Sequence, residues 1–218
     1  LLGRYYGRCL KLAQQIDTLP GFEIRFVNFG GGVGTVYDRT REQPLDFERL
    51  AEQAACVADE NQKTLGARLL IESGRFLTCN AGAYYTGVVD VKRSRGKTYV
   101  IVQGGLNGFS RPVFAHMLES LLPDGGFPAP EPLYTCKNAF LFELLTDEPQ
   151  RETVDLVGNL CTAADVLAAN ITLQKAEVGD LVRVSNAGSY AHALTPVQFS
   201  SHAAPTQYLL REDGSLAE

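Results

Sequence analysis

The stretch FEIRFVNFGGGVG, residues 22–34, decides how the rest of the chain is interpreted. Its first half alternates apolar residues and predicts a buried strand over Phe22–Asn28. Gly30, Gly31 and Gly32 come at the end of that strand, and consecutive glycines let backbone N–H groups converge on a small anion, usually a phosphate. A flexible loop is the alternative. The stretch is not a Walker loop, because no Lys-Ser/Thr pair follows, and no helix opens at once as in a Rossmann fingerprint.

The composition is that of an ordinary globular protein. The chain has 218 residues, of which 45% are hydrophobic and 21% charged, with room for one large domain or two small ones. A net charge of −5 argues against nucleic acid as a partner, and no apolar run is long enough for a membrane span. Five cysteines without CxxC spacing favour a reduced, cytoplasmic setting, and three scattered histidines give no metal-ligand pattern.

Residues 1–77 alternate between helix and strand. Apolar residues at helical spacing predict a helix over Leu1–Leu19, and a second helix opens at Pro44 and Asp46. A short apolar strand follows at Ala67–Ile71. This order, with parallel crossovers, is an α/β pattern, but two such units are too few for a closed barrel of eight strands. We therefore expect part of a (β/α)8 barrel.

The pattern changes to consecutive strands in residues 78–218. Turn clusters such as Arg95-Gly96 and Gly179-Asp180 separate the strands, and Pro123–Pro132 is predicted to be a surface loop. The predicted strands are Ala83–Lys92, Lys97–Gln103, Leu133–Leu144, Glu152–Leu160 and Asp180–Ser185. The fold class is thus α/β plus all-β, with a C-terminal antiparallel β domain that resembles a sandwich or barrel.

Three further motifs carry reactive side chains. Glu72 and Arg75 belong to ESGR, which follows a predicted strand and, taken singly, fits a surface ion pair. Cys161 and Asp165 belong to GNLCTAAD, which fits a buried cysteine beside a helix-capping aspartate. Tyr190 ends NAGSY and fits a core tyrosine with a satisfied hydroxyl. The order of the motifs along the chain changes these interpretations.

In this order GGGVG, ESGR, GNLCTAAD and NAGSY resemble the fold-type III pyridoxal-phosphate decarboxylases, the ornithine and diaminopimelate decarboxylase family. The resemblance covers nearly the whole chain but only the C-terminal half of that family. It implies an alanine-racemase-like barrel, a homodimer with shared active sites, pyridoxal 5′-phosphate as cofactor, and decarboxylation of an amino acid or amino-acid conjugate. It also implies a cofactor lysine upstream of Leu1, so that these 218 residues alone should be inactive.

The resemblance assigns cofactor contacts to the first two motifs. Gly30, Gly31 and Gly32 would hold the phosphate through backbone amides, Glu72 would face the pyridine nitrogen, and Arg75 would lie near the phosphate. A carboxylate beside the ring nitrogen favours the protonated pyridinium, which makes the cofactor an electron sink.

The resemblance places the remaining residues around the substrate. Cys161, as proton donor, and Asp165 would reach the active site of the partner subunit, and the Tyr190 hydroxyl would bind the phosphate. Phe199 would line the substrate pocket. Thr162 stands where the family commonly has an acidic residue that contacts a basic distal group of the substrate, which makes a plain diamino acid less favoured.

Alternatives to this assignment stay open. The stretch GGLNGFSRPVF together with CTAAD resembles family members of siderophore or carrier-bound secondary metabolism. A racemase-like enzyme would share the architecture and the cofactor, and release of CO₂ would discriminate. A non-catalytic homologue that binds the cofactor or an active partner, or an unrelated phosphate-binding domain, would lack the activity altogether.

Overall fold

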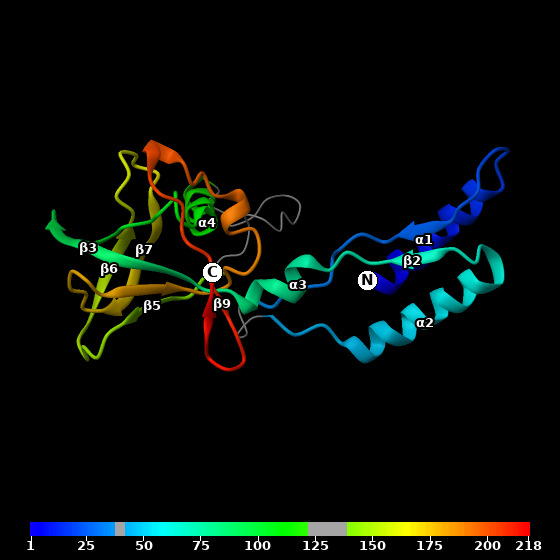
Figure 1. The fold of residues 1–218 in the computed structure, drawn as a ribbon, viewed down its shortest axis with the longest axis horizontal. Helices are drawn as coiled ribbons and strands as arrows, with labels where there is room; N and C mark the ends of the chain where they lie inside the picture. Colours follow the sequence, from blue (N-terminus) through cyan, green and yellow to red (C-terminus); the bar gives the residue numbers. More distant parts are fainter. Residues whose placement is uncertain (38–41, 122–138) are drawn as a thin grey trace. The chain divides into compact units, whose positions relative to one another are not determined.

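The computed structural model describes residues 1–37, 42–121 and 139–218. The chain forms two compact units, Leu1–Cys79 and Asn80–Glu218, which Figure 1 draws as a ribbon. The predicted boundary between the α/β part and the β domain, between residues 77 and 78, lies two residues before the boundary of these units. The predicted loop Pro123–Pro132 and the first part of the predicted strand Leu133–Leu144 lie outside the described residues.

The first unit contains two helices and a pair of parallel strands. Its elements are α1 (Leu2–Asp17), β1 (Phe26–Asn28), α2 (Phe47–Thr64), β2 (Arg68–Leu70) and the short helix α3 (Gly74–Thr78). β1 and β2 pair in parallel with Phe26 opposite Arg68, as predicted from their sequence order. Asp46 caps α2, because its carboxylate accepts a hydrogen bond of 2.9 Å from the Arg49 N–H.

One face of this strand pair packs against the helices, and Figure 1 shows α1 and α2 beside the strands. The buried cluster consists of Tyr6, Leu10, Ala13, Val27, Phe29, Val57 and Ala67. The predicted strand Phe22–Asn28 was therefore wrong in extent and partly in burial. The observed strand begins at Phe26, and the Phe22 and Phe26 side chains are 59% and 62% exposed. Alternation along a strand explains the exposure of Phe26, since its neighbour Val27 faces the helices.

The second unit is built on a six-stranded sheet with the order β5-β8-β3-β4-β6-β7. The strands are β3 (Tyr84–Ser94), β4 (Lys97–Val102), β5 (Phe142–Leu145), β6 (Arg151–Val157), β7 (Val166–Gln174) and β8 (Leu181–Val184). All neighbours pair antiparallel except β4 and β6, which are parallel. A separate small hairpin joins β9 (Leu209–Leu210) and β10 (Leu216–Ala217).

Helix α4 (Ser110–Leu121) and strand β7 are the longest elements of this unit that were absent from the sequence prediction. Helix α4 follows β4, packs against β7, and is drawn beside the sheet in Figure 1. Strand β7 begins directly after Asp165, so the segment predicted to carry only a loop motif continues as an edge strand of the sheet. Asn170 has a positive φ of 55° inside β7. Burial along the strand does not alternate, since the adjacent Leu167 and Ala168 are both buried, so the sequence lacks the period of two that predicts a strand.

Candidate functional site

The glycine turn and the ESGR motif meet at the carboxyl ends of β1 and β2. One backbone hydrogen bond joins them, because the Glu72 N–H donates to Gly30 O at 2.9 Å. Just before it, the Phe29 N–H donates to Leu70 O at 2.9 Å and continues the pairing of the two strands. The end of a parallel pair is where α/β folds commonly place binding groups. The structure thus brings together two motifs that lie far apart in the sequence.

The geometry of this turn requires glycine. Gly30 and Gly32 have φ values of 68° and 93°, in the left-handed region that L side chains rarely adopt. At Gly31 an added Cβ would lie 2.8 Å from the carbonyl oxygen of Glu72. The turn therefore keeps a path along the backbone clear of side chains at three consecutive positions, as an anion cradle requires.

A side chain that the sequence analysis missed joins the turn to the carboxylate. The Asn28 Nδ2 donates to Glu72 Oε1 at 2.6 Å, and the Gly30 N–H donates to Asn28 Oδ1 at 2.8 Å. A polar residue at the end of an apolar strand, one position before the glycines, was the signal that could have revealed Asn28. Arg75 lies in the first turn of α3 and is half-buried.

The GNLCTAAD loop contains an exposed thiol, that of Cys161, and a buried carboxylate, that of Asp165. Cys161 is exposed and forms no disulfide, and Thr162 is half-buried. The Asp165 side chain is only 3% exposed. Its Oδ1 accepts a hydrogen bond of 2.6 Å from the Leu106 N–H, and its Oδ2 accepts one of 3.0 Å from the Leu160 N–H. Asp165 therefore ties its own loop to the turn after β4.

Close packing surrounds the carboxylate of Asp165. A Cβ added at Gly105 or at Gly158 would overlap its oxygen atoms. Its charge also reaches Tyr84, whose hydroxyl donates to Gly104 O at 3.0 Å. Burial raises the pKa of Tyr84 above its ordinary value, a hydrogen bond with Thr86 opposes the rise, and the negative charge of Asp165 adds to it.

Tyr190 lies in a turn that is anchored at both ends. The Ala187 N–H donates to Gly82 O at 2.9 Å, and the Thr195 hydroxyl donates to Ala191 O at 2.7 Å. Tyr190 itself has a φ of 55° and is 42% exposed.

Residues at the start of α4 form hydrogen bonds with the same turn. The Ser110 N–H donates to Thr195 Oγ1 at 3.0 Å, and the buried Arg111 guanidinium donates to Ser189 O at 3.4 Å. Arg111 also lies over the ring of Phe140, 5.2 Å from its centroid. Phe199, predicted to line a substrate pocket, is half-buried in a short 3₁₀ helix farther along the chain.

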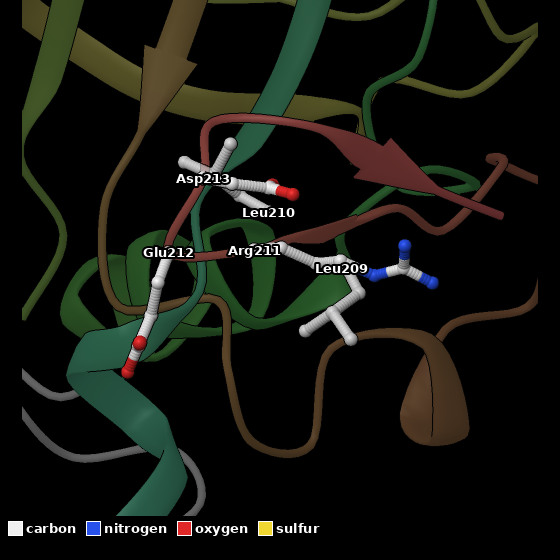
Figure 2. A pocket seen from close by; sticks show the side chains of 5 residues that line it. All are labelled: Leu209, Leu210, Arg211, Glu212 and Asp213. Atoms are coloured by element: carbon white, nitrogen blue, oxygen red, sulfur yellow. The ribbon is translucent and has the colours of Figure 1, made fainter.

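The described residues also contain an open pocket, but no candidate metal site and no helix that could span a membrane. Figure 2 shows an open depression lined by five consecutive residues of the β9–β10 hairpin, Leu209–Asp213, and none of the predicted site residues lines it. Within the part of the chain that the structure describes, no group of three or more His, Cys, Asp or Glu side chains could hold a metal ion. No described helix is long and apolar enough to cross a membrane.

Comparison with known proteins gives concordant matches. The chain is 30% identical over 207 residues to the L-glutamyl-[BtrI acyl-carrier protein] decarboxylase of Niallia circulans, which covers 94% of this chain and 45% of the relative. It is 31% identical over 186 residues to the 2-[(L-alanin-3-ylcarbamoyl)methyl]-2-hydroxybutanedioate decarboxylase of Staphylococcus aureus, over 84% of this chain and 43% of the relative. The chain thus spans somewhat less than half the length of these relatives.

A solved structure and a family model agree with these relatives. The crystal structure of diaminopimelate decarboxylase from Methanocaldococcus jannaschii superposes with a TM-score of 0.74 over 97% of this chain and 44% of that protein. At 22% identity this likeness shows the fold. The family model for the pyridoxal-dependent decarboxylase C-terminal sheet domain matches residues 34–188. The match extends over the end of the first unit and includes all six strands of the sheet in the second. The chain therefore belongs to the pyridoxal-dependent decarboxylases.

Proposed function

We propose that the intact protein is a pyridoxal-phosphate-dependent carboxy-lyase that removes CO₂ from an amino acid or an amino-acid conjugate. The observation that carries the proposal is the meeting of the glycine turn with Glu72 at the carboxyl ends of β1 and β2. Membership of the family supports the same activity.

The chemistry of this turn fits the cofactor. A phosphate needs converging N–H groups without side chains between them, and the turn offers three glycines in a row. A Cβ at Gly31 would lie 2.8 Å from the Glu72 carbonyl oxygen, so a side chain there would disturb the junction with Glu72. The protonated form of a pyridine nitrogen is stabilised by a carboxylate beside it, which Glu72 provides. Within the described residues the Ser73 Oγ is buried without a hydrogen-bond partner, so the site also has a polar atom to spare.

In this proposal the turn Gly30–Gly32 holds the phosphate through the N–H groups of Gly31 and Gly32, because the Gly30 N–H already donates to Asn28 Oδ1. Arg75 and the Tyr190 hydroxyl are further donors. Glu72 holds a proton at the ring nitrogen, because opposite charge stabilises the pyridinium form. The bound cofactor supplies an electron sink for the bond that breaks when CO₂ leaves.

We also propose that residues 1–77 are part of a (β/α)8 barrel. Phe26 and its strand partner Arg68 are exposed on the sheet face opposite the helices. In a closed barrel that face points into the interior, where neighbouring strands cover it. The parallel pairing of β1 and β2 supports this assignment.

In our proposal the Cys161 thiol reaches into the active site of the partner subunit of a homodimer, where it donates a proton to the carbon that has lost CO₂. An exposed thiol on a loop is accessible to a neighbouring subunit, which supports the proposal. Asp165 was predicted as a catalytic residue of the same loop. Its burial and its two backbone hydrogen bonds support a role in holding the loop instead of contact with the substrate.

We propose a conjugated amino acid of secondary metabolism, such as a siderophore precursor, as the substrate. Thr162 offers no carboxylate for a distal ammonium group, and Phe199 would line the pocket. The two relatives described above are named for a carrier-bound glutamyl substrate and for an alanine unit in amide linkage to a hydroxybutanedioate.

A cytoplasmic setting is also part of the proposal. The four free cysteines of the described residues support it, because thiols stay reduced in that compartment.

The test is an assay of the intact protein with pyridoxal phosphate. We expect stoichiometric CO₂ release from a conjugated amino acid, measured by mass spectrometry together with the decarboxylated product. Inversion of configuration without CO₂ would favour the racemase alternative. Cofactor binding without any turnover across conjugated and free amino acids would favour the non-catalytic homologue.

A further inference from the structure

Asn28 occupies the position between the glycine turn and the Glu72 carboxylate. It ends β1, and Val27 beside it faces the helices, so strand alternation directs the Asn28 side chain to the opposite face. Asn28 and Glu72 are 44 residues apart in sequence. The parallel register of Asn28 with Leu70 brings the two side chains together.

Both polar atoms of the Asn28 amide are used, and their partners fix its orientation. The Gly30 N–H can only donate, so the atom facing it at 2.8 Å must be the amide oxygen. The Glu72 carboxylate accepts, so the atom facing it at 2.6 Å must be the amide nitrogen. The opposite orientation would place donor against donor and acceptor against acceptor.

We infer that Asn28 is a positioning residue that holds the ring-nitrogen carboxylate and the phosphate turn at a fixed spacing, and this inference rests on the proposed function. The amide fixes the orientation of the Glu72 carboxylate, whose remaining lone pairs would face the ring nitrogen. Its oxygen also orients the Gly30 N–H, which stabilises the left-handed turn at that glycine. One side chain therefore positions the carboxylate and shapes the start of the turn, whose Gly31 and Gly32 N–H groups are proposed to face the phosphate.

The amide also leaves the charge of the site unchanged. A carboxylate at the same position would face Glu72 at hydrogen-bond distance, and two like charges so close favour protonation of one of them. Glu72 would then be a weaker partner for a protonated ring. An alanine would remove both hydrogen bonds and free Glu72 to rotate, at no cost in charge.

The inference is tested with pyridoxine 5′-phosphate and the intact protein. This probe has the ring nitrogen and the phosphate but no aldehyde, so its binding depends on noncovalent contacts. We expect Asn28→Ala and Asn28→Asp to raise its Kd by about tenfold to hundredfold, the range for losing a hydrogen bond to a charged group. We further expect Asn28→Ala to lower the pH at which the bound ring nitrogen deprotonates, because Glu72 is then free to rotate away from the ring. Ultraviolet absorbance follows this titration. Glu72→Gln is the reference for complete loss of that stabilisation.

Asn61→Ala is the matched control. Asn61 is a buried asparagine of the same unit whose Nδ2 donates to Ala67 O at 2.7 Å, before the start of β2 and away from the glycine turn. It should lower thermal stability without changing the Kd or the ring titration. Asn28→Asp keeps the side-chain shape, so it provides a folded variant if Asn28→Ala unfolds, as circular dichroism would show.

The outcomes separate the inference from the proposed function. Normal binding by the wild-type protein, with Kd and ring titration unchanged in both Asn28 variants, would overturn only the positioning role. Failure of the wild-type protein to bind pyridoxine 5′-phosphate would overturn the proposed function and the inference together.

Discussion

Replacing Asp165 with alanine should destabilise the β unit and release the loop that carries Cys161. The carboxylate accepts hydrogen bonds from the Leu106 and Leu160 N–H groups, and Leu106 lies 59 residues away in sequence. Asp165→Ala removes both acceptors and leaves two backbone donors without partners in the interior. The Cys161 loop and the turn after β4 would then lose the link between them.

The expected loss of unfolding free energy is about 2–4 kcal/mol. A hydrogen bond to a charged group contributes roughly 1.5–3 kcal/mol, and two are lost. Asp165→Ala also removes the free-energy cost of burying a charged carboxylate, and this gain offsets part of that sum. Asp165→Asn should cost less, roughly half as much, because its amide oxygen can still accept one of the two N–H groups.

A double-mutant cycle with Gly158 isolates the packing around the carboxylate. The three atoms nearest to a Cβ at Gly158 all belong to the Asp165 carboxyl group, so Gly158→Ala clashes with that group. Alone it should cost about 1–3 kcal/mol, as overpacking commonly does. Combined with Asp165→Ala the methyl group enters vacated space, and the two effects should fall short of additivity by about 1 kcal/mol or more.

The assay is urea unfolding followed by circular dichroism, together with amide hydrogen exchange. Exchange at the Leu106 and Leu160 amides measures directly whether their hydrogen bonds to Asp165 have been lost. This measurement is valid even if the whole chain does not unfold in one step. Asp180→Ala is the matched control, because Asp180 accepts an N–H from Glu177 at 2.8 Å in an exposed turn. It should cost less than about 1 kcal/mol. Strict additivity in the cycle, or unchanged exchange at both amides in Asp165→Ala, would refute the reasoning.

Three further predictions concern pH, assembly and selectivity. Burial disfavours the charged Asp155, but hydrogen bonds from Lys97 and the Asn170 N–H outweigh it and hold the Asp155 pKa below its ordinary value. Its stabilisation should therefore be present above about pH 4 and be lost as pH falls through the lowered pKa, so Asp155→Asn should flatten the acid limb of the stability curve. Mixing Cys161→Ala subunits with subunits that lack the cofactor lysine should restore part of the decarboxylase activity, and no restoration would count against shared sites. Thr162→Asp should shift the kcat/KM ratio toward substrates with a distal ammonium group by about 1–3 kcal/mol, and equal losses on basic and acidic substrates would exclude a contact there.

Local signals predicted the first unit well. Helical spacing gave α1, an Asp cap gave the start of α2, and the order of elements gave the parallel pairing of β1 and β2, all of which the structure confirms. The glycine run correctly indicated an unusual turn, because only glycine takes the φ values seen at Gly30 and Gly32 without strain. Burial was less predictable, since it depends on which face the helices cover.

Long-range contacts could not be predicted from the sequence. The Asn28–Glu72 bond depends on the register of two strands, which no local pattern specifies. Asp165 fits a helix cap when taken singly, yet its acceptors bind N–H groups of two separate loops. Strand β7 was missed for the same reason, because it is stabilised by pairing with β6 and not by its own alternation.

Asn28 and Asp165 act in similar ways but differ in charge, and the difference follows from their surroundings. Asp165 is enclosed by backbone N–H donors, where an anionic acceptor gains the most from each bond. Asn28 faces one donor and one carboxylate, so only an amide satisfies both. A cation in its place would bind Glu72 but would repel the protonated ring that Glu72 is proposed to hold. A neutral amide therefore fixes the position of the Glu72 carboxylate and, in the proposed function, leaves its negative charge for the ring nitrogen.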